Sequence, residues 1–183
     1  PGWTNWTQIA GLTGYRKDEV YTKAEVISSI NSKVSDIVAS SKYSLTYGSS
    51  ETITGKSIFF KSNVVMNNNT SLIFNNCTIY GNGKTLSILS TSGGNGNITF
   101  NNCDIYSLDL AVSGQADPAD EGSIIFTNSN IHNSSYSGAY SQITATGSSF
   151  YGFSVVGATT NVNIDSSSLY KSYIELASGA LTF

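Results

Sequence analysis

The octet FNNCTIYG, from Phe74 to Gly81, is followed 26 residues later by FNNCDIYS, from Phe100 to Ser107. Weaker copies continue the series as FTNSNIHN from Phe126, ATGSSFYG from Ala145 and IDSSSLYK from Ile164. The apolar triplets that open these units begin 26, 26, 19, 19 and 19 residues apart, and the last begins at Leu181. Such self-spacing is the sequence signature of a repeat architecture, in which each unit stacks on the next.

Within each unit, apolar residues alternate with other residues, and this period of two predicts short strands with one buried face. The first strand carries Leu72/Phe74, Ile98/Phe100, Ile124/Phe126, Ile143/Ala145 and Val162/Ile164. The second carries Ile79, Ile105, Ile131, Phe150 and Leu169, and a third aligns Tyr136/Gly138, Val155/Gly157 and Ile174/Leu176. Three short strands per repeat predict an all-β domain over 42–183, a right-handed single-chain parallel β-helix with coils of 19–26 residues.

Stacked coils lie about 4.8 Å apart, so each residue should sit above its equivalent one coil earlier. Asn76, Asn102 and Asn128 form one such column, and we expect their side-chain amides to hydrogen-bond along it. Cys77 and Cys103 form the next column. Parallel side chains would hold their Cβ atoms about 4.8 Å apart rather than the ~3.8 Å of a disulfide, so both thiols should be free and buried.

The composition excludes several functions. Charged residues make up 11% of the chain, the net charge is −3, and the nine Lys and Arg residues are scattered, which argues against nucleic-acid binding. We expect neither a membrane span nor a secretory signal, because no apolar run is long enough and the first residues lack a charged segment before an apolar stretch. No spacing of His, Cys or Asp suggests a metal site, and no cofactor is expected.

The segment YTKAEV, from Tyr21 to Val26, predicts a helix start after a Trp-containing leader at 1–21. The helix should run over 22–41 with one apolar stripe. Ile27 and Val34 fit heptad position a, and Ile30 and Ile37 fit position d, a pattern that favours three or more strands. The alternative is that this stripe covers the open end of a single β-helix.

The order of these modules carries a resemblance. The leader GWTNWTQIAGLTGY, the YTKAEV helix and the domain rich in Ser, Asn and Gly together resemble a bacteriophage tail fibre or tailspike protein. The resemblance implies a homotrimer on the virion tail, synthesised in the host cytoplasm and attached to other virion tail proteins. It also implies recognition of a host cell-surface polysaccharide and, in many members, its depolymerisation.

One column of rings should face outward, because each ring follows an inward apolar residue. Its members are Tyr80, Tyr106, His132, Tyr151 and Tyr170. Stacked rings with hydroxyl tips suit sugar binding. A ladder that only protects the strands, or a trimer interface, fits the same pattern.

Glycoside cleavage needs two carboxylates that face each other about 5 to 9.5 Å apart. The acidic candidates are Asp104, Asp109, Asp117, Asp120 and Glu121. Asp104 has no second acid beside it in its column, and Asp109 could share a site with the DPADEG run, although that run is more typical of a solvated loop. The sequence therefore favours attachment without catalysis. A polysaccharide hydrolase or lyase of the same architecture is the first alternative, and a purely structural shaft or assembly protein is the second.

Two further expectations come from the spacing. The extra residues of the first two coils fall between Gly81 and Asn97 and between Ser107 and Ser123, so both loops should emerge side by side. These loops could mark a functional face, provide trimer contacts or have no specific role. Leu181–Phe183 should restart the first strand in register, which would leave apolar core to be covered by further chain, by other protomers or by another protein.

Overall fold

The computed structural model describes residues 37–39, 50–67, 69–90, 95–114 and 122–183. The chain divides into two units, Pro1–Ser35 and Asp36–Phe183, and every described strand belongs to the second. Within the described ranges, every regular secondary-structure element is a β-strand. The all-β expectation is therefore confirmed for this part of the chain.

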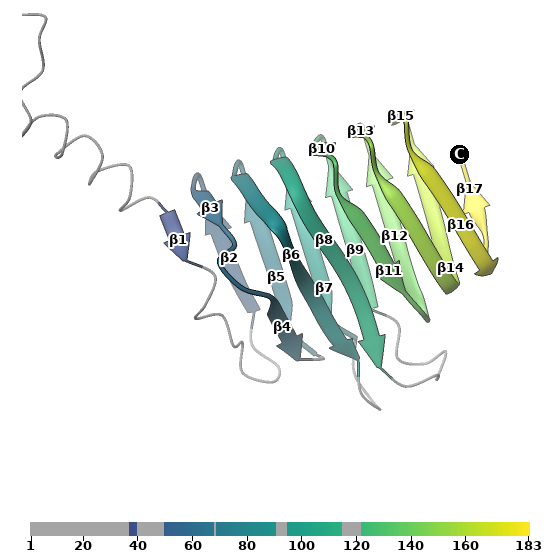
Figure 1. The fold of residues 1–183 in the computed structure, drawn as a ribbon, viewed down its shortest axis with the longest axis horizontal. Helices are drawn as coiled ribbons and strands as arrows, with labels where there is room; N and C mark the ends of the chain where they lie inside the picture. The colour runs from purple at the N-terminus through teal and green to yellow at the C-terminus, as the bar shows by residue number, and fades with distance from the viewer. Residues whose placement is uncertain (1–36, 40–49, 68, 91–94, 115–121) are drawn as a thin grey trace, which may run out of the picture. The chain divides into compact units, whose positions relative to one another are not determined.

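The strands form two sheets in which all pairings are parallel (Figure 1). Sheet B contains β2 (Ser50–Thr54), β5 (Ser71–Asn75), β7 (Asn97–Asn101), β9 (Gly122–Thr127), β12 (Ser141–Thr146), the end of β14 (Ser154–Asp165) and β17 (Leu181–Thr182). Sheet A contains the start of β14 and β1 (Ile37–Ala39), β3 (Ser57–Phe59), β4 (Val64–Asn67), β6 (Thr78–Ser90), β8 (Asp104–Gly114), β10 (Asn130–His132), β11 (Ser135–Gly138), β13 (Ser149–Tyr151), β15 (Ser168–Tyr170) and β16 (Tyr173–Ser178).

The register follows the repeat predicted from the sequence. Leu72 pairs with Ile98, which pairs with Ile124, and the series continues through Ile143 and Val162 to Leu181. The second and third strands pair in the same way, so all predicted columns from residue 72 onward are confirmed. Parallel strands stacked one repeat apart are consistent with a parallel β-helix.

The core consists of inward side chains stacked along these columns. Phe74, Phe100 and Phe126 lie parallel, with ring centroids 5.2 and 5.3 Å apart, and all are buried. The Ile79, Ile105 and Ile131 column is also fully buried. Residues at one height in successive coils therefore pack on copies of themselves, which explains why the octet recurs.

The structure contains an earlier coil that the sequence analysis missed. Strands β2, β3 and β4 pair with β5 and β6, and Ile53 stacks on Phe74. The pattern was hidden because Glu51, not an apolar residue, pairs with Leu72. Only Ile53 remained as an inward marker of the first strand.

Cys77, Cys103, Ser129 and Ser148 form a buried column at the corner between the two sheets. Both cysteines are free, as predicted. The backbone N–H of Cys103 donates to Ser129 Oγ at 3.0 Å, and the N–H of Ser129 donates to Ser148 Oγ at 3.2 Å. Ser129 Oγ in turn donates to the Thr127 carbonyl at 3.0 Å. These hydroxyls continue the inter-coil hydrogen bonding where the strands bend.

The predicted amide ladder is displaced by one residue. Asn76, Asn102 and Asn128 adopt φ of 52°, 52° and 48°, the left-handed conformation that asparagine tolerates better than most residues. The hydrogen bond between side-chain amides instead joins the preceding residues, where Asn101 Nδ2 donates to Asn75 Oδ1 at 2.9 Å. In each Asn-Asn pair, the first asparagine thus hydrogen-bonds to the neighbouring coil through its side chain. The second asparagine adopts the left-handed conformation of the turn.

Gly81, the last residue of the first octet, is required by close backbone approach. A Cβ at this position would lie 2.2 Å from the Cα of Leu108 in the next coil. Here the register of β6 and β8 also shifts, because Tyr80 pairs with Tyr106 but Lys84 pairs with Leu108. The sheet bends at this bulge, and the ring of Tyr80 lies just before it.

A buried hydroxyl cluster lies where β11 leads into β12. Tyr136, whose ring was predicted to point inward, is 1% exposed, and its hydroxyl donates to Ser141 Oγ. Ser141 Oγ lies 3.0 Å from Thr160 Oγ1. Gly138 makes room for this cluster, since a Cβ there would lie 2.3 Å from the Tyr136 hydroxyl. The three hydroxyls satisfy one another inside an otherwise apolar core.

The predicted helix over 22–41 is wrong at its C-terminal end. Ile37–Ala39 forms strand β1, which pairs in parallel with Ser57–Phe59 of β3. Adjacent β-branched residues favour extended backbone, and pairing with an available sheet edge overrides the helical periodicity. The rest of this helix, with Ile27, Ile30 and Val34, lies outside the described residues.

We expect Ser129→Ala to lower the free energy of unfolding by about 1 to 3 kcal/mol, because the buried N–H of Cys103 would lose its acceptor. Ser149→Ala, which is exposed in the next coil, is the matched control and should change it by less than about 0.5 kcal/mol. Urea denaturation of both variants checks this. Equal effects would show that the corner hydroxyl does not replace a strand hydrogen bond.

Burial raises the pKa of Tyr136, because the phenolate would lose its hydration. A raised folded-state pKa leaves stability intact below about pH 10 and reduces it as the pH rises further, since only the unfolded chain then ionises readily. We expect Tyr136→Phe to show a smaller loss of unfolding free energy than the parent above about pH 10. Urea denaturation of both proteins across that pH range measures this. A parallel decline in their free energies of unfolding would contradict it.

Burial also raises the pKa of the Cys103 thiol to about 11, so almost no thiolate exists near neutral pH. We expect a thiol-reactive dye to label Cys77 and Cys103 only after denaturation. Rapid labelling of both in the native protein, or a mass that reveals an intrachain disulfide, would contradict their placement.

Candidate functional site

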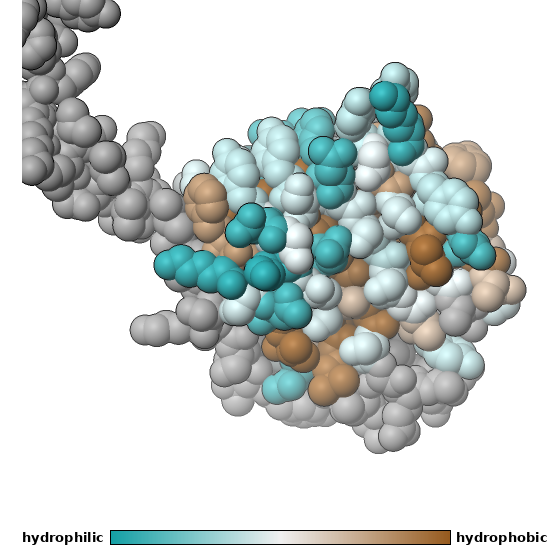
Figure 2. All heavy atoms as spheres, in the orientation of Figure 1, coloured by the Kyte–Doolittle hydropathy of each residue, from teal (hydrophilic) through white to brown (hydrophobic). Residues whose placement is uncertain are grey.

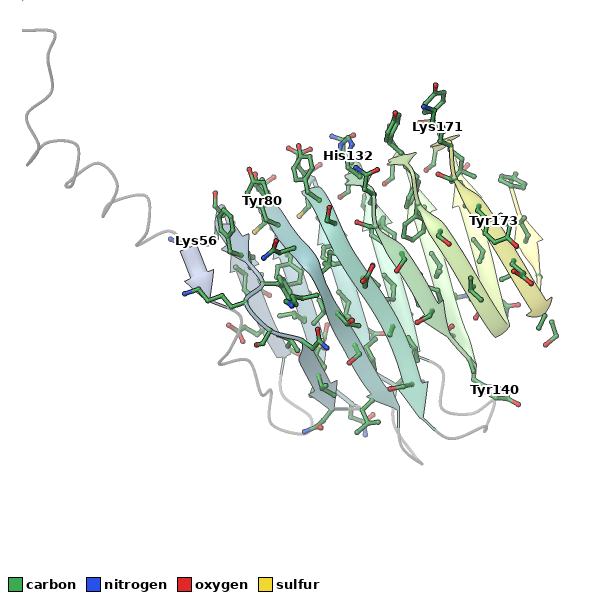
Figure 3. The ribbon with its side chains drawn as sticks, viewed as in Figure 1. Lys56, Tyr80, His132, Tyr140, Lys171 and Tyr173 are labelled. Carbon is green, nitrogen blue, oxygen red and sulfur yellow. The ribbon has the colours of Figure 1, made fainter. Side chains whose placement is uncertain are left out.

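The predicted ring column is continuous in the structure and begins one coil earlier than expected, at Phe59. We call Phe59, Tyr80, Tyr106, His132, Tyr151 and Tyr170 the ring column. Successive ring centroids lie 4.6, 5.4, 4.9, 6.4 and 5.1 Å apart. All pairs are stacked except His132 and Tyr151, which are tilted by 40°. Figure 3 shows Tyr80 and His132 along the same edge of the stacked coils.

Strands β3, β6, β8, β10, β13 and β15 position the ring column. In each strand an inward apolar residue, such as Ile105 in β8, is followed by the ring, which therefore points outward; this inward residue is buried in all of them except β15, where Leu169 is partly buried. Tyr80 is 37% exposed and Tyr170 is 57% exposed. The in-register pairing of these short strands thus creates an aromatic surface.

Stacking decides which parts of the rings can meet a ligand. Centroids about 5 Å apart with small interplanar angles leave no space for another ring between neighbours. The ring faces are therefore used within the column, while ring edges and tyrosine hydroxyls face the solvent. A ligand along this surface would meet hydroxyl groups and CH edges in regular succession.

A polar column runs beside the rings, two residues earlier in each strand and hence roughly 7 Å away on the same face. It comprises Thr78, Asp104, Asn130, Ser149 and Ser168. Asn130 Nδ2 donates to Asp104 Oδ1 at 2.8 Å, and Ser168 Oγ donates to Ser149 Oγ at 3.2 Å. These side chains keep further hydrogen-bonding capacity toward the solvent.

Lys171 adds a positive charge to this surface, and the sequence analysis did not single it out. Its Nζ lies 5.5 Å from the Tyr170 ring centroid and 5.8 Å from that of Tyr151, within the range of a cation–π interaction. Figure 3 shows Lys171 on the same edge as Tyr80 and His132. The repeat places Lys171 directly after the ring of Tyr170, so this residue could have been found from the sequence. In the same way, Phe59 could have been found because it follows the inward residue Ile58.

The described acidic candidates do not form a pair in neighbouring strands. Asp104 pairs in register with Thr78 and Asn130, and Asp109 pairs with Thr85 and Ser135. Asp109 Oδ1 accepts a hydrogen bond from Ser135 Oγ at 2.6 Å. The other candidates, Asp117, Asp120 and Glu121, lie outside the described residues. The two predicted side-by-side loops are largely strands instead, since residues 84–90 of β6 pair with residues 108–114 of β8, and only residues 91–94 and 115–121 lie outside the described ranges.

The described ranges contain neither a membrane-spanning helix nor a metal-binding cluster. No helix there is long and apolar enough to cross a membrane. No group of three or more His, Cys, Asp or Glu side chains in those ranges is arranged to hold a metal ion.

Comparison of the chain with protein-family models, with curated proteins and with solved structures finds no match in any of the three.

Proposed function

We propose that this chain is part of a bacteriophage tail fibre or tailspike that attaches to a host cell-surface polysaccharide. In this proposal the domain is a right-handed, single-chain parallel β-helix within a homotrimer on the virion tail. An N-terminal helical seam with Ile27, Ile30 and Val34 aligns the three chains, whereas Ile37 belongs to β1. The order of sequence modules supports this class of protein.

The observation that carries the attachment function is the ring column and its polar neighbour. Together they present hydroxyls, an amide and a carboxylate in columns with a repeat near 5 Å. Polysaccharides offer hydroxyl groups at a regular interval, so a regular array can engage several sugar units at once. Each contact is weak, and affinity comes from their number.

Mutual stacking favours a second function for the same rings. Four stacked ring pairs and one tilted pair stabilise the coils, and this holds whether or not a ligand binds. A purely structural shaft would need no more than this. The hydroxyl groups separate the two functions, because stacking requires the rings but not the hydroxyls.

A polysaccharide depolymerase is supported less well. Asp104 and Asp109, the described candidates, each pair in register with uncharged residues. Hydrolysis with two carboxylates would require a partner from elsewhere. Product analysis after incubation of the protein with host polysaccharide tests this alternative, and loss of cleavage in Asp104→Asn would support it.

We expect the double variant Tyr106→Phe, Tyr151→Phe to bind host polysaccharide more weakly while keeping its thermal stability. The rings still stack, but two exposed hydroxyls are lost, each a contribution of about 0.5 to 1.5 kcal/mol or roughly 2- to 10-fold. A glycan array identifies the polysaccharide, and titration of parent and variant against it measures the loss.

Tyr173→Phe is the matched control, since Tyr173 is exposed in β16 but lies outside the ring column. It should bind like the parent. If the double variant also binds like the parent, the ring column is a structural ladder only. If the parent binds no glycan on the array or in titration with host polysaccharide, the attachment function is wrong.

A further inference from the structure

We propose that the end of the ring column around Lys171 binds an acidic group of the polysaccharide, a carboxylate or a phosphate carried by one of its sugars. This subsite rests on the proposed attachment function and adds a specificity-determining residue to it. The ammonium of Lys171 attracts the acidic group, and Tyr151 and Tyr170 contact the sugar that carries it.

The ammonium of Lys171 has no carboxylate partner among the described residues. Its neighbours there are the rings of Tyr151 and Tyr170, and the side chain is exposed. The next acid along the chain, Glu175, accepts a hydrogen bond from the Tyr173 hydroxyl at 2.6 Å. An ammonium carries three donor hydrogens, and rings do not accept them as oxygen atoms do. Lys171 can therefore donate to an anionic ligand.

The backbone of Lys171 is in a conformation that does not suit a long side chain. The residue directly after each ring makes a turn with positive φ, at 51° for Ser107, 47° for Asn133, 66° for Gly152 and 49° for Lys171. Glycine and asparagine tolerate this left-handed region, whereas a lysine there is uncommon. The fold would be satisfied by glycine, as Gly152 shows one coil earlier. Unfavourable backbone conformations of this kind cluster at ligand-binding sites.

The surroundings of Lys171 are free of negative charge along the ring face. Asp104, the acid in the polar column, lies three inter-strand steps from β15, about 14 Å away. Exposed charges farther apart than about 8 Å are largely screened at physiological ionic strength. The polar column ends beside Lys171 with Ser149 and Ser168, which are uncharged. This end of the surface is therefore positive.

Tyr151 and Tyr170 form a ring pair that is set apart from the rest of the column. His132 and Tyr151 are 6.4 Å apart and tilted by 40°, the widest separation in the column. Tyr151 and Tyr170 stack at 5.1 Å, and Lys171 Nζ lies within 6 Å of both centroids. Two hydroxyl groups, two ring edges and one ammonium thus lie together, and an acidic sugar offers hydroxyls, CH groups and a negative charge to match them.

The chemistry of lysine sets the class of ligand. An ammonium is a compact point charge on a flexible stem, so it binds carboxylates and phosphates alike, whereas arginine favours planar bidentate pairing. Figure 3 shows Lys171 on the edge of the stack that carries Tyr80 and His132. In the same orientation, Figure 2 shows that this edge is covered mainly by hydrophilic side chains. The site is therefore open to a long polar chain such as a polysaccharide.

The test titrates parent and variants of the full chain against the glycan that binds most tightly on the array. We expect that glycan to be acidic and Lys171→Gln to bind it roughly 3- to 10-fold more weakly, with a smaller dependence on salt concentration. Lys171→Arg keeps the charge and should bind within about 2-fold of the parent. Lys84→Gln is the matched control, because it removes the same charge from β6, away from β15, and should bind like the parent.

Changing the ligand identifies the acidic group. Carbodiimide activation followed by borohydride converts the carboxylates of the glycan to alcohols, and hydrofluoric acid removes its phosphates. One of these treatments should weaken binding of the parent by the same factor as Lys171→Gln, and it should leave binding of Lys171→Gln unchanged. The treatment with that effect shows whether the group is a carboxylate or a phosphate.

A stability measurement separates ligand binding from a structural role. Lys171→Gly relieves the positive φ, so we expect its melting temperature to equal or exceed that of the parent while its binding of the acidic glycan falls as in Lys171→Gln. A lower melting temperature with unchanged glycan binding would overturn the proposal, because the lysine would then serve only to stabilise the two rings.

The remaining outcomes keep this subsite and the attachment function apart. A parent that binds only neutral glycans, or a Lys171→Gln variant that binds the acidic glycan like the parent, overturns the subsite and leaves attachment through the ring column intact. Loss of binding in Lys171→Gln but not in the Tyr106→Phe, Tyr151→Phe variant supports the subsite and contradicts the role of the ring hydroxyls. A parent that binds no glycan overturns both.

Discussion

The structure depends on one constraint, the in-register parallel pairing of each coil with the next. Because the backbone hydrogen bonds join residues one repeat apart, a side chain always lies against its counterpart in the neighbouring coil. Phe74, Phe100 and Phe126 satisfy this by parallel stacking, and Ile79 and Ile105 by packing of identical branched side chains. A repeated sequence is thus the direct consequence of a repeated environment.

The corners meet the same constraint with different chemistry. Where strands bend, backbone N–H groups lose regular partners, and buried polar groups without partners are costly. Ser129 and Ser148 provide acceptors for the coil before, and Tyr136 with Ser141 and Thr160 forms a buried hydroxyl cluster. Small and polar residues at these positions therefore stabilise the fold, although their composition resembles that of a loop.

Side chains on the outer faces do not pack in the core, and the columns of the two sheets differ there in composition. Sheet A presents stacked rings beside a polar column with Asp104 and Asn130, an arrangement suited to hydroxyl-rich ligands. Sheet B presents an outer face of mostly uncharged polar side chains with Ile73 and Ile125 in its middle column. One repeat can thus maintain two outer surfaces of different composition, because alternate residues of each strand face outward.

The sequence by itself determined the repeat, the parallel strands, the columns and the free cysteines, because period-two patterns and fixed spacing encode local pairing. Only the tertiary structure decided that Asn101, not Asn102, continues the amide bonding, since φ at the turn depends on the corner geometry. The same holds for β1 at Ile37–Ala39, where pairing with β3 overrides a helical pattern. The first coil, with Glu51 at an inward position, became visible only once distant residues were placed together. The place of Lys171 after Tyr170 could be read from the repeat, but the approach of its Nζ to the rings of Tyr151 and Tyr170 could not.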